Sequence, residues 1–192
     1  MEEKTIDYSK YYWQNEKVRF RASKGTDWEE HFYNYFDSEA RFLLESQIEL
    51  PVDAGIEEEN SKKHTDYNNT GRIMFTIETL DGINVGGINI NSIDERNGTF
   101  GIGMQINRNY RGKGYGTSAM KILLDYAFNE RRLHKYQGFV IEGNIASETM
   151  LIKLGCVKEG IIRGTTFHKG KYWNEIHYGL FAEEFNNKNK KD

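Results

Sequence analysis

The sequence predicts one α/β domain in which a mixed, mostly antiparallel sheet of about seven strands carries helices on both faces. Alternating apolar and polar residues occupy 72–80, 83–90 and 99–106. The first two runs meet at Asp81-Gly82, a strong hairpin signal. After residue 107 the apolar residues recur with the period of a helix. The length of 192 residues suits a single domain.

The N-terminal part is expected to hold a strand and an aromatic helix. Residues 17–21 alternate in the manner of a first strand. Thr26 and Glu29 have the Thr-x-x-Glu spacing of a capping box, which predicts a helix over residues 28–36. Its aromatic residues recur at i, i+3 and i+4, so they either face the core, which we favour, or line a binding pocket: Trp28, His31, Phe32, Tyr35 and Phe36.

A second helix is predicted over residues 39–48, ending before Pro51. The segment 53–69 is polar, acidic and then rich in asparagine. Such a composition favours a loop, with one helical turn over residues 57–63. The acidic residues Glu57 to Glu59 are expected to form a solvated face or to attract a cationic substrate.

The second half of the chain is expected to alternate between helices and strands. Apolar residues from Ala119 to Phe128 recur at spacings of one, three and four, which predicts a helix. The later elements are predicted to be a strand at 136–141, a helix at 146–154 and two final strands joined at 168–171. Residues 186–192 are polar and are expected to form a C-terminal tail after a domain spanning residues 1–185.

Composition excludes several classes of protein. The chain has 26 Lys and Arg residues against 29 Asp and Glu, a net charge of −3, so we expect no electrostatically driven nucleic-acid binding. Cys156 is its single cysteine, which rules out an intramolecular disulfide and a thiolate-rich metal site and favours the reducing cytoplasm. No metal is implied. No apolar run approaches the roughly 18 residues of a membrane span, and the N-terminus lacks the apolar stretch of a signal peptide.

Residues 107–117 concentrate glycines and cations between a predicted strand and a predicted helix. The segment reads Asn107-Arg-Asn-Tyr-Arg-Gly-Lys-Gly-Tyr-Gly-Thr117. Backbone N–H groups and the positive end of a helix dipole favour an anion, and glycine lets the anion approach the backbone closely. The segment therefore predicts a phosphate-binding site.

Two familiar phosphate motifs fit this segment poorly. The P-loop spacing, Gly-x4-Gly-Lys-Ser/Thr, is absent. Gly114, Gly116 and Ala119 satisfy a loose dinucleotide fingerprint, but seven residues separate it from the preceding strand, which is expected to be antiparallel. A nicotinamide-dependent oxidoreductase is therefore a minor alternative.

Two segments resemble a known family. Arg111-Gly-Lys-Gly114-Tyr-Gly116 resembles the Arg/Gln-x-x-Gly-x-Gly/Ala signature of the GCN5-related N-acetyltransferases (GNAT). Residues 144–160 resemble the later helix-and-strand motif of that family, especially in its ribosomal-protein alanine and spermidine acetyltransferase branches. With Gly170 to Trp173, the resemblance covers roughly residues 71–185.

The resemblance implies a GNAT-like fold that transfers an acetyl group from acetyl-CoA, as co-substrate, to a primary amine. The amine would be a small molecule or a protein N-terminus. A non-catalytic acyl-CoA-binding module is the alternative, and a homodimer is left open because the final strands could pair between subunits. The implied contacts are the strand residues Met104, Gln105 and Ile106 with pantetheine, Arg111, Gly112, Lys113, Gly114, Tyr115, Gly116 and Thr117 with the diphosphate, and Asn144, Ser147 and Lys153 elsewhere on the co-substrate.

Several residues are candidates for the groups that would move protons. Many members of the family carry a tyrosine at the position of Leu151, so the resemblance implies that Ser147 acts at the sulfur instead. Asn144 can equally be a helix N-cap, and Ser147 a solvated hydroxyl. Glu175 and His177 share one face of the last strand at i and i+2 and form a candidate base or an ordinary surface pair. Glu78, Glu142 and a water molecule are further candidates for the base.

Overall fold

The computed structural model describes residues 6–64 and 72–190 and contains one seven-stranded sheet in the order β1-β2-β3-β4-β5-β7-β6. The strands are β1 (Val18–Ala22), β2 (Ile73–Thr79), β3 (Asn84–Asp94), β4 (Thr99–Ile106), β5 (Lys135–Ile141), β6 (Val157–His168) and β7 (Lys171–Phe181). Adjacent strands are antiparallel except for the parallel pair β4 and β5. The predicted fold class is confirmed.

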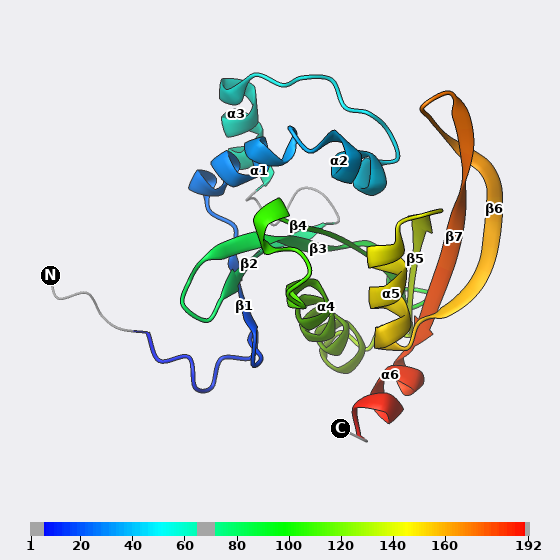
Figure 1. Cartoon of the computed structure of the whole chain (residues 1–192). Helices are drawn as coiled ribbons and strands as arrows, with labels where there is room; N and C mark the ends of the chain where they lie inside the picture. The colour runs from blue at the N-terminus through cyan, green and yellow to red at the C-terminus, as the bar shows by residue number, and fades with distance from the viewer. Residues whose placement is uncertain (1–5, 65–71, 191–192) are drawn as a thin grey trace, which may run out of the picture.

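Helices cover both faces of this sheet. They are α1 (Trp28–Asn34), α2 (Ser38–Glu45), α3 (Ala54–His64), α4 (Tyr115–Asp125), α5 (Ile145–Leu154) and α6 (Ala182–Asn189). Figure 1 shows α1, α2 and α3 on one side of β2, β3 and β4, and α4 on the other. Residues 186–189 of the predicted polar tail belong to α6. No described helix is long and apolar enough to cross a membrane.

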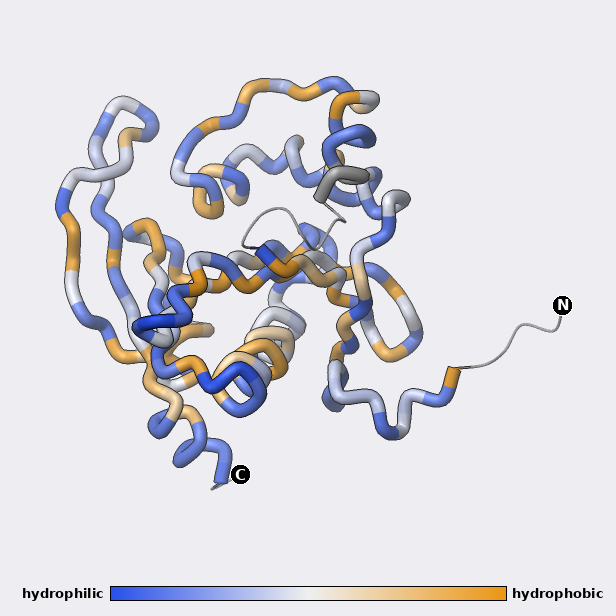
Figure 2. The backbone as a smooth tube through the Cα atoms, turned by 180° about the vertical axis from the view of Figure 1, so that it is seen from behind, coloured by the Kyte–Doolittle hydropathy of each residue, from blue (hydrophilic) through white to orange (hydrophobic). Residues whose placement is uncertain are grey.

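The apolar core lies between the sheet and α4. Strand residues such as Phe20, Ile88 and Phe100 are fully buried there, and Leu123 and Leu124 of α4 are fully buried against them. Figure 2 shows apolar, orange stretches that alternate with hydrophilic ones along the central strands and on α4. Removal of this apolar surface from water is the main force that holds α4 to the sheet.

The opposite face of the sheet is polar where it meets the beginning of α1. Glu78 of β2 accepts hydrogen bonds from Arg19 Nε at 2.8 Å and from Arg21 Nε at 3.0 Å. Arg21 also binds Asp27, and Lys24 N–H donates to Asp27 Oδ2 at 2.7 Å. Burial alone would raise the pKa of Asp27, but these donors and Thr76 outweigh it and lower that pKa to about 2. A charged cluster therefore attaches α1 to the sheet.

The predicted capping box at the start of α1 is wrong. Thr26 is exposed, and Asp27 rather than Thr26 occupies the N-cap position. The Asp27 carboxylate accepts a hydrogen bond from Lys24 N–H instead of capping the helix. The ion pair with Arg21 directs the carboxylate toward the sheet, which a local sequence pattern does not reveal.

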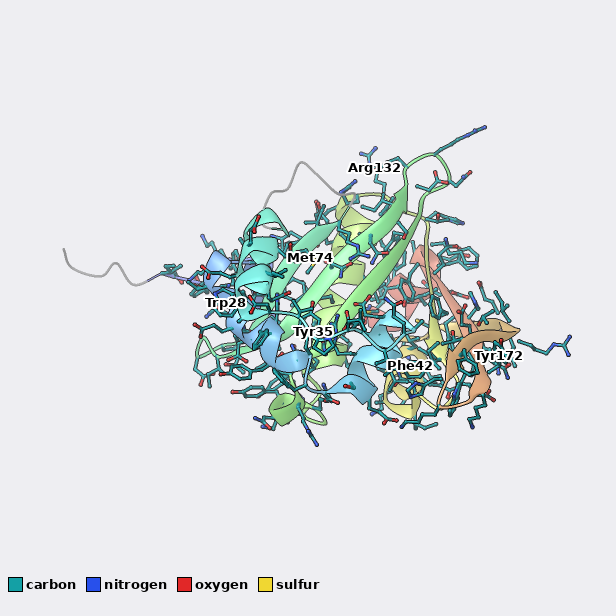
Figure 3. All side chains as sticks on the ribbon, turned by 90° about the horizontal axis from the view of Figure 1, so that it is seen from above. Trp28, Tyr35, Phe42, Met74, Arg132 and Tyr172 are labelled. Carbon is teal, nitrogen blue, oxygen red and sulfur yellow. The ribbon has the colours of Figure 1, made fainter. Side chains whose placement is uncertain are left out.

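The aromatic residues of the predicted helix 28–36 do not form part of the core, contrary to the interpretation that we favoured. Trp28, His31, Phe32 and Tyr35 are partly buried, and the Phe36 residue is 72% exposed. Figure 3 looks onto the sheet from this side and shows Trp28 in α1 and Tyr35 just after its end, on the side nearest the viewer. They therefore remain candidates for a binding surface.

A further difference concerns residues 54–64, which form α3 rather than a loop with one helical turn. Glu57 of this helix is buried and accepts a hydrogen bond from the Tyr35 hydroxyl at 3.2 Å. Tertiary contact with α1 therefore stabilises a helix that a polar sequence did not suggest. The end of the predicted loop, residues 65–69, lies outside the described residues. The second predicted helix also ends early, because Ser46 adopts a left-handed conformation after Glu45.

Candidate active site

The sheet opens between β4 and β5. These parallel strands pair only at their beginnings, where Thr99 lies opposite Lys135 and Phe100 opposite Tyr136. Beyond these pairs β4 remains bonded to β3, and β5 remains bonded to β7. One backbone edge of each strand is therefore free of sheet pairing beyond Phe100 and Tyr136, and a ligand could pair with it.

The loop after β4 is held against the N-terminal helices. Asn107 is buried, its backbone N–H donates to Val85 O at 2.9 Å, and its Oδ1 accepts from Asn34 Nδ2 at 3.1 Å. A short 3-10 turn, η2 (Arg108–Tyr110), then leads to the glycines. The loop is thus fixed at its beginning by contacts with β3 and α1.

The Arg111 side chain connects this loop to α2. Its Nε donates to Ile106 O at 2.8 Å, and its Nη1 binds Asp37 Oδ2 at 2.7 Å. Asp37 also caps α2 by accepting from Ala40 N–H. Burial would raise the pKa of Asp37, but the Arg111 hydrogen bond and the Ala40 amide outweigh it and hold that pKa below its ordinary value. Two of the Arg111 nitrogens are therefore engaged within the protein.

Helix α4 begins directly after this loop, without a side-chain cap. Gly114 is the N-cap residue, with φ +84°, and Gly112 has φ +76°, both favourable for glycine. The first intrahelical hydrogen bond runs from Ser118 N to Gly114 O, so the N–H groups of residues 115–117 have no acceptor within the helix. A Cβ on Gly116 would lie 3.0 Å from Met104 Cε, which shows how closely α4 packs on β4.

The second predicted segment begins α5 beside the end of β5. Asn144 is its N-cap and accepts a hydrogen bond from Ser147 N–H at 3.2 Å, so the capping role considered for Asn144 is observed. Ser147 is partly buried in the first turn. Exposed Lys153 lies in the last turn, about 13 Å along the helix axis from Asn144. The two residues therefore mark opposite ends of α5.

A buried tyrosine fixes the first turn of α5 against β7. The Tyr178 hydroxyl donates to Glu148 Oε1 at 2.5 Å. Burial, followed by the hydrogen bond to Glu148, raises the pKa of Tyr178 to about 12, so the phenol keeps the proton that it donates. Ser147, which precedes Glu148, is thereby held in place.

Some side chains of β4, β5 and β7 lie on the face of the sheet opposite to α4 and α5, which is the side of α2. Met104 and Ile106 pack toward the core, so Gln105 between them faces the other way, where its Oε1 accepts from Arg41 Nη1 at 3.0 Å. On β7, Tyr178 faces α5 and His177 therefore lies on the opposite side, 5.6 Å from the Phe139 ring between centroids.

Glu175 and His177 lie together on this face. Glu175 Oε2 is 3.4 Å from His177 Nε2, and Glu175 Oε1 accepts from Thr166 Oγ1 at 3.4 Å. The side chains are 18% exposed for Glu175 and 35% for His177. Buried nitrogen atoms without a hydrogen-bond partner among the described residues lie on Gln105, His168 and His177. The pair is thus more enclosed than an ordinary surface pair.

The remaining proton-transfer candidates occupy less suitable places. Glu78 is bound by both Arg19 and Arg21 near the edge of the sheet, so it is not free to accept a proton. Glu142 is exposed and accepts from Asn174 Nδ2 at 2.9 Å. Leu151, at the position where the resemblance implied a tyrosine, is 2% exposed and belongs to the core. No group of three or more side chains suited to a metal occurs within residues 6–64 and 72–190.

Comparison with known proteins identifies the family. Residues 17–157 match the model of the acetyltransferase (GNAT) domain. The chain belongs to the GNAT family. Within this family it is 29% identical over 182 residues to the SPbeta prophage-derived uncharacterized N-acetyltransferase YokL of Bacillus subtilis, covering 91% of this chain and 95% of YokL. The uncharacterized N-acetyltransferase YnaD of Bacillus subtilis is 33% identical over 88 residues, 46% of this chain and about half of YnaD (52%).

A solved N-acetyltransferase structure has the same fold. It is the spermidine N-acetyltransferase from Vibrio cholerae in complex with CoA and spermine, with a TM-score of 0.77 and 20% identity over 89% of this chain and 99% of that one. The predicted membership of the GNAT family is confirmed, as is the prediction of an acyltransferase. The roles of the individual site residues remain predictions.

Proposed function

We propose that this GNAT protein transfers the acetyl group of acetyl-CoA to a primary amine. The opening between β4 and β5 beside the uncapped start of α4 is the observation that carries the proposal. The V. cholerae relative, with the same fold, binds CoA and spermine. The residues here suit such a ligand, because α4 offers free N–H groups to a diphosphate and β4 offers an open backbone edge to pantetheine.

In this proposal the co-substrate and the acceptor amine bind on different sides of the sheet. Residues 111–117 bind the diphosphate, and Asn144 and Lys153 contact the co-substrate along α5. The backbone edge of β4 from Met104 through Gln105 to Ile106 pairs with pantetheine, through groups other than Ile106 O, which accepts from Arg111 Nε. The acceptor amine approaches from the side of α2. The two substrates then meet in the opening between the strands, where the thioester is accessible from both faces.

The chemistry requires a neutral amine and a stabilised thiolate. The amine nitrogen forms a bond with the acetyl carbon, the C–S bond breaks, and the amine loses a proton. Glu175, directly or through His177, accepts that proton, and the Ser147 hydroxyl donates a hydrogen bond to the departing thiolate. Deprotonation of an alkylamine at pH 7 costs roughly 4.6 kcal/mol, but that of an α-amine costs only about 1 kcal/mol.

An acetylation assay over a panel of amines tests the proposal. The panel contains polyamines, aminoglycosides, free amino acids and peptides with different N-terminal residues, and mass spectrometry detects a gain of one acetyl group. We expect product and an equal amount of free CoA thiol with at least one class. Acetyl-CoA binding without product or thiol release over the whole panel would favour the non-catalytic acyl-CoA-binding module. A cytoplasmic location and a homodimer remain predictions.

Replacement of Ser147 by alanine is expected to lower kcat about tenfold, because the thiolate loses a hydrogen-bond donor. The Kd of acetyl-CoA should change less than about twofold, since Asn144 keeps the helix cap and accepts from the backbone of residue 147. Thr149→Ala removes an exposed hydroxyl from the same helix and serves as the control. Unchanged kcat in Ser147→Ala with normal binding would remove Ser147 from the reaction.

A further inference from the structure

A lysine from the N-terminal segment lies beside the beginning of α4. A Cβ atom placed on Gly114 would be 3.1 Å from Lys17 Nζ, so this ammonium group is next to the N-cap residue of α4. Lys17 is otherwise exposed to solvent. The charge is therefore available to a ligand bound at the start of the helix.

The backbone on both sides of Lys17 is fixed to the fold. Asn15 Nδ2 donates to Ser118 O in the first turns of α4 at 2.9 Å, and Asn15 Oδ1 accepts from the backbone N–H groups of Lys17 and Val18, each at 3.1 Å. Val18 is fully buried in the core. The position of Lys17 beside α4 thus follows from contacts that do not involve its own side chain.

The motif arginine is less available to an anion than its place in the signature suggests. Arg111 uses Nε for Ile106 O and Nη1 for Asp37. Lys113 is exposed, and its Nζ lies 5.2 Å from the centroid of the Tyr110 ring. A diphosphate carries two negative charges, which the partial charge of a helix N-terminus does not balance. Lys113 can supply one full positive charge, and a second cation beside the start of α4 would balance the other phosphate charge.

We propose that Lys17 binds the diphosphate of the acyl-CoA co-substrate, a contact from outside the motif of residues 111–116. The inference rests on the proposed function, because it assumes that the ligand at α4 is a CoA thioester. Lys17 would act as a binding residue that lowers the Kd of the co-substrate, and it takes no part in proton transfer. Its compact ammonium group suits a contact with phosphate oxygens as a point charge.

The test measures the Kd of acetyl-CoA by calorimetry on the full chain. Lys17→Ala should raise this Kd about fivefold, the effect of one partly exposed charge-assisted contact. Lys17→Arg should stay within about twofold of the unsubstituted protein. Lys10→Ala, which removes an exposed lysine from the same N-terminal segment, is the matched control for net charge and should have no effect. Thermal unfolding establishes that each variant is folded.

A second ligand shows whether Lys17 contacts the diphosphate or the 3′-phosphate of CoA. With 3′-dephospho-CoA the effect of Lys17→Ala should persist, because the diphosphate is still present. Loss of the effect with this ligand would assign Lys17 to the 3′-phosphate and overturn the proposal. Equal Kd values for Lys17→Ala and the unsubstituted protein would overturn it while leaving the proposed function intact. Failure of the unsubstituted protein to bind CoA would instead reject the proposed function, and this inference with it.

Discussion

Replacement of Gly86 by alanine is expected to lower the free energy of unfolding by about 3 kcal/mol. Gly86 lies in β3 with φ +151° and faces Ile106 of β4 in the strand register. An added Cβ would be 2.2 Å from Gln105 O and 3.0 Å from Ile106 Cα. Both are backbone atoms, so a side-chain rotation cannot relieve the overlap and the two strands must separate.

Urea denaturation of Gly86→Ala and Gly160→Ala checks this expectation. Gly160 lies in β6, and a Cβ placed there meets no heavy atom within 4 Å, so its substitution should change stability by less than about 0.5 kcal/mol. A loss below about 1 kcal/mol in Gly86→Ala would mean that β3 and β4 are less closely packed than the structure indicates. In folded Gly86→Ala the displaced end of β4 should also weaken acetyl-CoA binding, because Gln105 and Ile106 belong to the proposed pantetheine edge.

Local patterns were sufficient to predict the centre of the sheet and α4. Alternation along most of their length and the turn at Asp81-Gly82 determine β2 and β3, because the side chains of a strand have only two faces to occupy. The helical period after residue 107 similarly determines α4, whose apolar side is buried against the sheet. These elements are determined by residues close together in the sequence or by one continuous apolar face.

Long-range polar contacts explain what the sequence did not predict. Helix α3 has little apolar character of its own, and its buried residue Glu57 is held by Tyr35. The Arg111–Asp37 ion pair joins residues 74 positions apart, and Lys17 approaches Gly114 from another segment of the chain. No spacing rule connects such residues, so only the folded arrangement brings them together.

Sequence spacing was also insufficient to choose between the candidate bases. The i, i+2 spacing placed Glu175 and His177 on one face, but it did not show which face or how buried they are. In the structure the pair lies on the side of α2, and Glu175 accepts a hydrogen bond from Thr166. Glu78, in contrast, forms ion pairs with two arginines. Glu175 is therefore the candidate base that the geometry supports best.

Glu175→Gln is expected to lower kcat about 100-fold at pH 7 with an alkylamine acceptor. The amide keeps the size of the side chain but cannot accept the proton of the amine. The loss should be smaller with an α-amine acceptor, because a larger fraction of that amine is already neutral at pH 7. Glu142→Gln, which changes an exposed carboxylate at the end of β5, is the matched control and should retain activity.

The pH dependence separates a base from a residue that only maintains the structure. Below the pKa of the acceptor, the neutral fraction of the amine rises about tenfold for each pH unit. Activity of Glu175→Gln should therefore recover toward that of the unsubstituted enzyme as pH increases, since solvent then removes the proton that Glu175 would have taken. A structural defect would give a constant deficit at every pH. A constant deficit, or a loss of activity in Glu142→Gln with none in Glu175→Gln, would place the base elsewhere.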